Sequence, residues 1–236
     1  QYVLRPDADF RGYSGKIASG IVRRGDRVVA LPSGHMSRIA RIVTYDGDLE
    51  EAFAPQSVTL TLEDEIDLSR GEMLVHPDDL PHVGHRFRAM MVWMDEEPLD
   101  RSKAFYLKHT TRTTRAHVGT IHHRVEINVG EQVEADGMKL NEIALVSLVT
   151  DSPLIYDGYR ENRQTGAFIL IDPVTNFTSA VGMIVAPDEE TSAGDSDRIV
   201  IDLAACGIAP EHDEAIAEFC RALRRQTGIE VECTRK

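Results

Sequence analysis

Histidine and arginine side chains are concentrated in one segment of the sequence, residues 109–124, which reads HTTRTTRAHVGTIHHR. Such side chains bind anions and acidic partner surfaces, and neutral histidines also bind metal ions. His122 and His123 are adjacent, and because successive residues of a strand point to opposite faces, they would not bind one metal together. Two interpretations remain: a patch that binds an anion or a partner, or a solvated hairpin of a β-barrel. The hairpin requires fewer assumptions, and we favour it.

Nucleotide chemistry has one weak signal in the sequence. Residues 9–12, Asp-Phe-Arg-Gly, match the DxxG pattern that contacts magnesium in GTPases. A phosphate-binding GxxxxGK[ST] loop and a guanine-specific NKxD motif are both missing from the sequence, so the short DxxG match is best explained by chance. The sequence therefore predicts no nucleotide, cofactor or metal bound by this chain.

Acid–base or nucleophilic catalysis is not predicted either. The acids Asp64, Glu65 and Asp67 lie beside Ile66 and Leu68 just before a turn, in a pattern typical of an exposed strand edge. The sequence contains no GxSxG elbow, and no histidine has the spacing of a zinc protease. We therefore expect no catalytic residue in this chain.

Composition restricts the classes of partner. The 236 residues include 26 Lys+Arg against 39 Asp+Glu, which gives a net charge of −13. Nucleic-acid binding depends on basic faces that neutralise phosphates, so nucleic acid is not expected as the main partner. No apolar run reaches the roughly 20 residues that cross a bilayer. The sequence begins without a signal-peptide pattern and has 3 cysteines without a CxxC pair, so we expect a protein of the reducing cytoplasm.

The order of hydrophobic segments predicts a mainly β protein in three parts. Short runs rich in Val, Ile and Thr, separated by turn residues, fill residues 1–80 and 81–187 and indicate two β-barrels in tandem. Residues 188–236 carry 6 basic and 12 acidic side chains and begin with an acidic linker. There we expect a small β-α-β element: a strand over 198–203, a helix from Pro210 that stops at Gly228, and an extended segment over 229–233.

The motifs of residues 1–187 resemble those of a known protein family. The stretch IASGIVRRGDRVVALPSG (17–34) is similar to the second domain of translation-factor-type GTPases. Further motifs resemble the large, GTP-binding subunit of bacterial sulfate adenylyltransferase. They are QYVLRP (1–6), DFRGYSG (9–15), EIDLSRGEML (65–74), MVWMDEEPL (91–99), LNEIALVSL (140–148) and PLIYDGYRENRQTGAFILIDPVTNFTSAVGMI (153–184). Residues 188–236 resemble nothing that we could assign.

The resemblance implies a role in sulfate activation. In that family a small catalytic subunit makes adenylylsulfate and pyrophosphate from ATP and sulfate, and GTP hydrolysis by the large subunit drives the reaction. The family's GTP-binding motifs lie upstream of the region matched here, so GTP and Mg are expected only in that preceding domain. The resemblance thus implies two translation-factor-type β-barrels that dock a GTPase domain in cis and the small catalytic subunit.

Two groups of residues are candidates for the partner interface, because arginine and aromatic side chains are enriched at interfaces. They are Phe10, Arg11 and Tyr13, in the loop that enters the first barrel, and Arg112, Arg115 and His117. Two alternatives stay open. The chain could be an RNA-binding module like those of elongation factors, or a stand-alone scaffold protein that lacks a GTPase domain.

Overall fold

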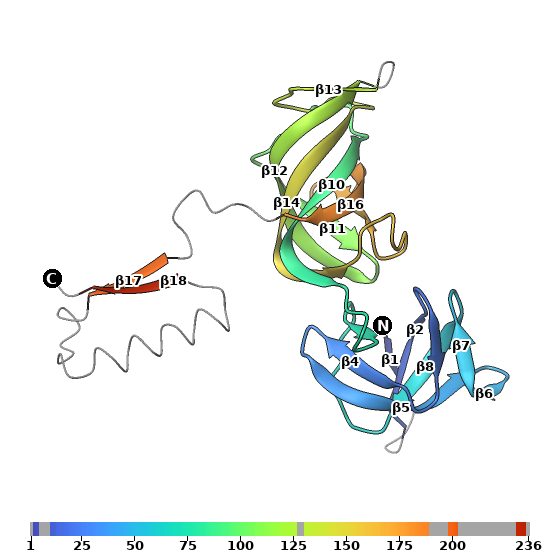
Figure 1. Cartoon of the computed structure of the whole chain (residues 1–236). Helices are drawn as coiled ribbons and strands as arrows, with labels where there is room; N and C mark the ends of the chain where they lie inside the picture. The colour runs from blue at the N-terminus through green and yellow to red at the C-terminus, as the bar shows by residue number, and fades with distance from the viewer. Residues whose placement is uncertain (1, 5–9, 127–129, 189–197, 203–229, 235–236) are drawn as a thin grey trace. The chain divides into compact units, whose positions relative to one another are not determined.

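The computed structural model describes residues 2–4, 10–126, 130–188, 198–202 and 230–234 (Figure 1). In these residues every regular element is a β-strand. The chain forms two compact units, residues 1–189 and residues 190–236. The first unit contains two seven-stranded antiparallel sheets and a two-stranded ribbon. The predicted fold class, tandem β-barrels of the translation-factor GTPase type, is confirmed.

The first barrel comprises strands β1 to β9. Their bounds are β1 Tyr2–Leu4, β2 Gly12–Lys16, β3 Ile21–Arg23, β4 Arg27–Leu31, β5 His35–Thr44, β6 Gly47–Leu49, β7 Glu51–Phe53, β8 Ser57–Leu62 and β9 Met73–Val75. The sheet order is β1-β2-β8-β5-β4-β9, with β6 on β5, and β3 pairs with β7. Ile39, Ile42 and Ala52 form part of its core. Gly25 makes the turn before β4 with φ +86°, a value that favours glycine.

The second barrel comprises strands β10 to β16. Their bounds are β10 His82–Trp93, β11 Ala104–His109, β12 Arg112–Glu126, β13 Glu131–Val133, β14 Ile143–Tyr156, β15 Ala167–Ile171 and β16 Thr178–Pro187. Six of them close on themselves in the order β11-β15-β16-β10-β14-β12, because β12 also pairs with β11. The interior is filled by one apolar cluster that includes Phe87, Trp93, Tyr156 and Phe168. Closure pairs the two edge strands of the sheet with each other. The barrel therefore has no open sheet edge that another element must cover.

The second unit contains a pair of parallel strands, β17 (Arg198–Asp202) and β18 (Glu230–Thr234). Parallel pairing requires a crossover connection between the two strands. This is the strand arrangement that a β-α-β element needs. The predicted helix, between Pro210 and Gly228, lies outside the described residues.

The two barrels contact each other through an apolar junction. Val29 and Leu31 of β4 form one buried cluster with Ile155 of β14, and Met73 and Val75 of β9 pack against it. Ile155 comes from the second barrel, whereas the other four side chains come from the first. The junction lies near the end of β14, because that strand finishes at Tyr156.

One close contact in the second barrel requires a glycine, because there is no space for a larger side chain. Gly182 of β16 is paired with Phe168 of β15, and a Cβ atom on residue 182 would overlap the Phe168 ring. That ring is 3% exposed and packs edge-on against Phe87, with the ring centroids 5.6 Å apart. The ring therefore has no free space to move into.

We predict that Gly182→Ala lowers the free energy of unfolding by about 1–3 kcal/mol, because overpacking a filled core forces neighbouring side chains out of their preferred positions. Urea unfolding of the 236-residue chain measures the change. Gly84→Ala is the matched control, since a Cβ atom at residue 84 would have no atom within 4 Å. Equal losses of stability in the two variants would contradict the packing argument.

The turn between β15 and β16 is organised by one buried carboxylate. Asp172 Oδ1 accepts hydrogen bonds from the amides of Val174 (2.7 Å) and Thr175 (2.9 Å), and Oδ2 pairs with the Lys103 ammonium. The bond from Lys103, together with those from the two amides, lowers the pKa of Asp172 from its ordinary value of 3.8 to about 2. The ionised form of Asp172 therefore stabilises this turn.

We predict that Asp172→Asn destabilises the second barrel in a pH-dependent way. The folded-state pKa lies below the unfolded-state value, so the carboxylate contributes its full stability above about pH 4–5 and loses it as pH falls towards 2. The difference in unfolding free energy between native protein and variant should be constant near neutral pH and shrink between about pH 4 and pH 2. Urea unfolding at several pH values in this range measures that difference in unfolding free energy. Asp151→Asn, at an exposed position, is the control. A difference that does not change with pH would contradict the stabilising role of the ionised Asp172.

Candidate interaction surface

The residues predicted at the entrance to the first barrel have structural contacts within the chain. Tyr13 is 2% exposed, and its hydroxyl donates a 2.5 Å hydrogen bond to the carbonyl oxygen of Ile66. Arg11 donates to Asp67 at 2.6 Å, and its guanidinium lies 5.8 Å from the centroid of the Tyr13 ring. Phe10 is half-buried beside Gly12. These side chains hold the segment around residue 66 against β2, and their role in partner binding stays a prediction.

Arg112 lies at the contact between the two barrels. It is half-buried at the start of β12, and a Cβ atom on Gly71 would be 2.9 Å from the Cβ of Arg112. Gly71 has φ +93° and precedes β9 of the first barrel. Arg112 therefore packs beside Gly71, and its part in a partner interface also stays a prediction.

Arg115 and His117 lie on the outer face of the second barrel. Both are exposed, and they alternate with the buried residues Thr114, Ala116 and Val118. In the sheet Arg115 is paired with Tyr106 of β11, and Tyr106 is paired with Ile171 of β15. Of the six predicted interface residues, these two are exposed side chains on a regular strand.

The other basic residues of segment 109–124 do not join them. His109 is 1% exposed, and its Nε2–H donates to the carbonyl oxygen of Thr165 at 2.7 Å. Burial lowers the pKa of His109, which favours the neutral ring. His122 is hydrogen-bonded to Ser147, and Arg124 donates to Glu142 at 2.5 Å. The segment therefore does not assemble a single anion site.

Sequence reasoning missed two apolar rows on the outer face of the second barrel. One row runs across four adjacent strands through Ile169, Val181, Val92 and Ile143, each paired with the next. All four are half-buried, although they point away from the core.

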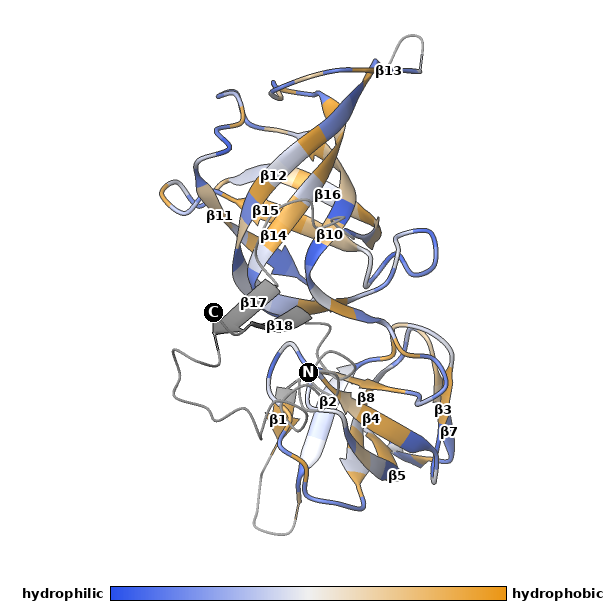
Figure 2. Cartoon of the chain, turned by 60° about the vertical axis from the view of Figure 1, so that its left-hand side comes forward, coloured by the Kyte–Doolittle hydropathy of each residue, from blue (hydrophilic) through white to orange (hydrophobic). Residues whose placement is uncertain are grey.

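The second row lies beside the first and contains Met183, Met90 and Leu145, again paired in that order. We call the two rows together the outer apolar rows. Figure 2 shows hydrophobic residues along the length of β14 and β16. The signal was present in the sequence, because these strands have continuous hydrophobic runs, such as AFILI at 167–171, instead of alternation.

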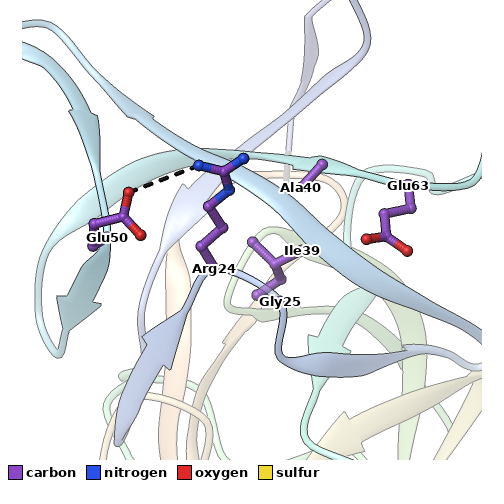
Figure 3. A pocket seen from close by; sticks show the side chains of 6 residues that line it. All are labelled: Arg24, Gly25, Ile39, Ala40, Glu50 and Glu63. Atoms are coloured by element: carbon purple, nitrogen blue, oxygen red, sulfur yellow. Dashed lines mark ion pairs between the residues drawn. The ribbon is translucent and has the colours of Figure 1, made fainter.

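A shallow depression in the first barrel does not contain a catalytic arrangement (Figure 3). Its lining residues are Arg24, Gly25, Ile39, Ala40, Glu50 and Glu63. Arg24 and Glu50 form an ion pair at 3.8 Å, and both side chains are mostly exposed. Exposed ion pairs of this kind contribute little to stability and supply no nucleophile.

Within the described residues, no group of His, Cys, Asp and Glu side chains is placed to hold a metal ion. In that same part of the chain, no helix is long and apolar enough to span a membrane.

Comparison with known proteins gives one matching family profile. It is described as "GTP-eEF1A C-terminal domain-like" and matches residues 86–185, which lie in the second barrel. Among solved structures, Sup35 complexed with GDP is similar with a TM-score of 0.67, covering 76% of this chain and 44% of that chain at 16% identity. At that identity the likeness shows the fold alone.

Curated relatives are much more similar in sequence. Sulfate adenylyltransferase subunit 1 of Bacteroides fragilis is 55% identical over 232 residues, which are 98% of this chain and 48% of the relative. The protein of the same name from Bacteroides thetaiotaomicron is 54% identical over 98% of this chain and 50% of its own length. The bifunctional enzyme CysN/CysC of Rhodopirellula baltica is 48% identical over 78% of this chain and 29% of its own length.

This chain thus spans about half the length of the subunit 1 proteins that it matches. At 98% coverage, the two Bacteroides alignments must extend into residues 188–236, the part that the sequence motifs left unassigned. The resemblance inferred from the motifs is confirmed: the chain is homologous to the C-terminal part of sulfate adenylyltransferase subunit 1.

Proposed function

We propose that this chain is the non-catalytic β-barrel part of a GTP-dependent sulfate adenylyltransferase large subunit. It docks the GTPase domain that precedes it and the small catalytic subunit, and so supports formation of adenylylsulfate and pyrophosphate from ATP and sulfate. GTP and Mg are bound by the GTPase domain, and this chain binds neither. The homology to subunit 1 proteins supports the assignment.

The outer apolar rows are the observation that best supports the docking role. The second barrel is closed, and its interior is already filled by aromatic and aliphatic side chains. Apolar side chains that point outward from such a barrel do not contribute to its core, and contiguous apolar surface of this kind marks interaction sites. We assign the outer apolar rows to the GTPase domain, because interfaces that form permanently are more apolar than transient ones.

The two barrels are suited to relay the nucleotide state as one body. They share the buried junction of Val29, Leu31 and Ile155, and residues 1–189 form one compact unit. A GTPase domain that changes its contacts on hydrolysis can reposition such a compact unit relative to itself. The small subunit, held by the barrels, then experiences that change.

We predict that Arg115→Ala combined with His117→Ala weakens binding of the small subunit by about fivefold, the order expected for truncating interface side chains. Both residues are exposed, so the barrel should keep its stability. Isothermal titration of the complete large subunit with the small subunit measures the affinity. Arg27→Ala, an exposed arginine of β4, is the control. Unchanged affinity in the double variant would remove Arg115 and His117 from the interface.

We predict that Met90→Gln combined with Leu145→Gln loosens the GTPase domain. In the complete large subunit, protease cleavage between the GTPase domain and the first barrel should become several times faster. In the 236-residue chain, the urea midpoint should change little, because both side chains point away from the core. Equal protease resistance of native and variant subunits would mean that the outer apolar rows do not hold the GTPase domain.

A further inference from the structure

Exposed apolar side chains gather at one end of the second barrel. Val174 and Phe177, between β15 and β16, are 80% and 74% exposed. Met94, directly after β10, is 49% exposed, and Leu140, before β14, is 44% exposed. Because β15, β16, β10 and β14 are consecutive antiparallel neighbours, these positions share one end of the sheet. We call the three segments 94–103, 134–142 and 172–177 the loop end.

Hydrogen bonds connect the segments of the loop end to one another. Trp93 Nε1 donates to the carbonyl oxygen of Glu97 at 2.8 Å, and the Leu99 amide donates to the carbonyl oxygen of Met138 at 2.9 Å. The Ser179 hydroxyl donates to Asp95 at 2.9 Å, which joins the start of β16 to the segment after β10. The exposed apolar side chains are therefore presented by ordered backbone.

The Val174–Phe177 turn is fixed most firmly. Asp172 accepts the amides of Val174 and Thr175, and the Asp172 amide donates to the carbonyl oxygen of Phe177 at 2.9 Å. Asn176 adopts φ +61°, a conformation that asparagine tolerates better than most residues. A turn held in this way pays little entropy on binding, so its two apolar side chains are suited to act as anchors.

Acidic groups surround these apolar side chains. Glu96, Glu97 and Asp100 are exposed on the first segment, and Glu134 and Asp136 are exposed on the second. Two exposed cations, Arg101 and Lys139, lie on the same segments. The excess of carboxylates repels phosphates, and it also opposes the docking of a second copy through the same acidic end. The surface fits a partner with an apolar centre and a basic rim.

The loop end lies at the opposite end of β10 and β14 from the apolar junction with the first barrel. β10 has 12 residues, so its start at His82 and its end at Trp93 are at most about 36 Å apart along the strand. The junction with the first barrel uses Ile155, near the opposite end of β14 from Leu140. A GTPase domain that precedes residue 1 would enter through β1 of the first barrel. Val92 and Ile143 of the outer apolar rows adjoin the loop end, so a separate chain that binds there would lie beside the GTPase domain.

We propose that the loop end is the anchor site for the small catalytic subunit, which binds Val174 and Phe177 in an apolar recess surrounded by lysine and arginine. This proposal rests on the proposed function and specifies where the separate subunit is held. Arg115 borders the same site, because it is paired with Tyr106 and Tyr106 with Ile171, the residue that precedes Asp172.

The test is an isothermal titration of the complete large subunit with purified small subunit. Val174→Ser combined with Phe177→Ser should raise Kd by at least about tenfold, as expected for the loss of anchor residues. Met36→Ser combined with Tyr45→Ser is the matched control, because it removes two other exposed large side chains, which lie in the first barrel, and should leave Kd unchanged.

A second variant tests the charge argument. Glu96→Lys combined with Glu97→Lys should slow association and reverse its dependence on salt, as measured by stopped-flow mixing, because the acidic rim steers a basic partner. Faster or unchanged association would overturn the assignment of a basic rim to the small subunit.

The outcomes separate the two proposals. If native large and small subunits do not bind each other, the proposed function fails, and the anchor site fails with it. If they bind and the Val174/Phe177 variant binds equally well, the anchor site alone is overturned. If light scattering shows a native dimer that this variant converts to a monomer, without any change in small-subunit affinity, the loop end serves a second copy and our proposal is wrong.

Discussion

Closure of the second barrel is the constraint on which the rest of the structure depends. The pairing of β11 with β12 completes a ring of six strands, and that ring encloses a core of aromatic and aliphatic side chains. Once closed, the barrel does not need the apolar side chains of its outer face or its loops to complete its core. Apolar side chains in those places, such as Val181 and Phe177, are thus available for contacts with other domains or chains.

The fold could be read from the sequence because its signals are local. Short Val-, Ile- and Thr-rich runs between turn residues indicate barrels, and the ordered motifs of residues 1–187 indicate the family. The role of each candidate residue could not be read in the same way. Tyr13 and Arg115 occur in similar polar surroundings in the sequence, yet one is buried under the segment around Ile66 and the other is exposed. Strand pairing over long sequence separations decides that difference.

The sequence contains the residues of the two outer surfaces but does not show which way their side chains face. Continuous hydrophobic runs such as AFILI indicate a strand buried on both faces, and in this barrel the second face is turned outward. Likewise, Val174 and Phe177 look like ordinary loop residues until Asp172 and Lys103 are seen to fix the turn that presents them. Both surfaces follow from tertiary pairing and not from local propensity.

We propose that the second barrel is a platform for the GTPase domain and the small catalytic subunit. Hydrogen exchange of the complete large subunit, measured with and without the small subunit, tests it most directly. We predict slower amide exchange in segments 94–103, 134–142 and 172–177 when the small subunit is bound. Formation of the complex with unchanged exchange throughout residues 82–187 would contradict it.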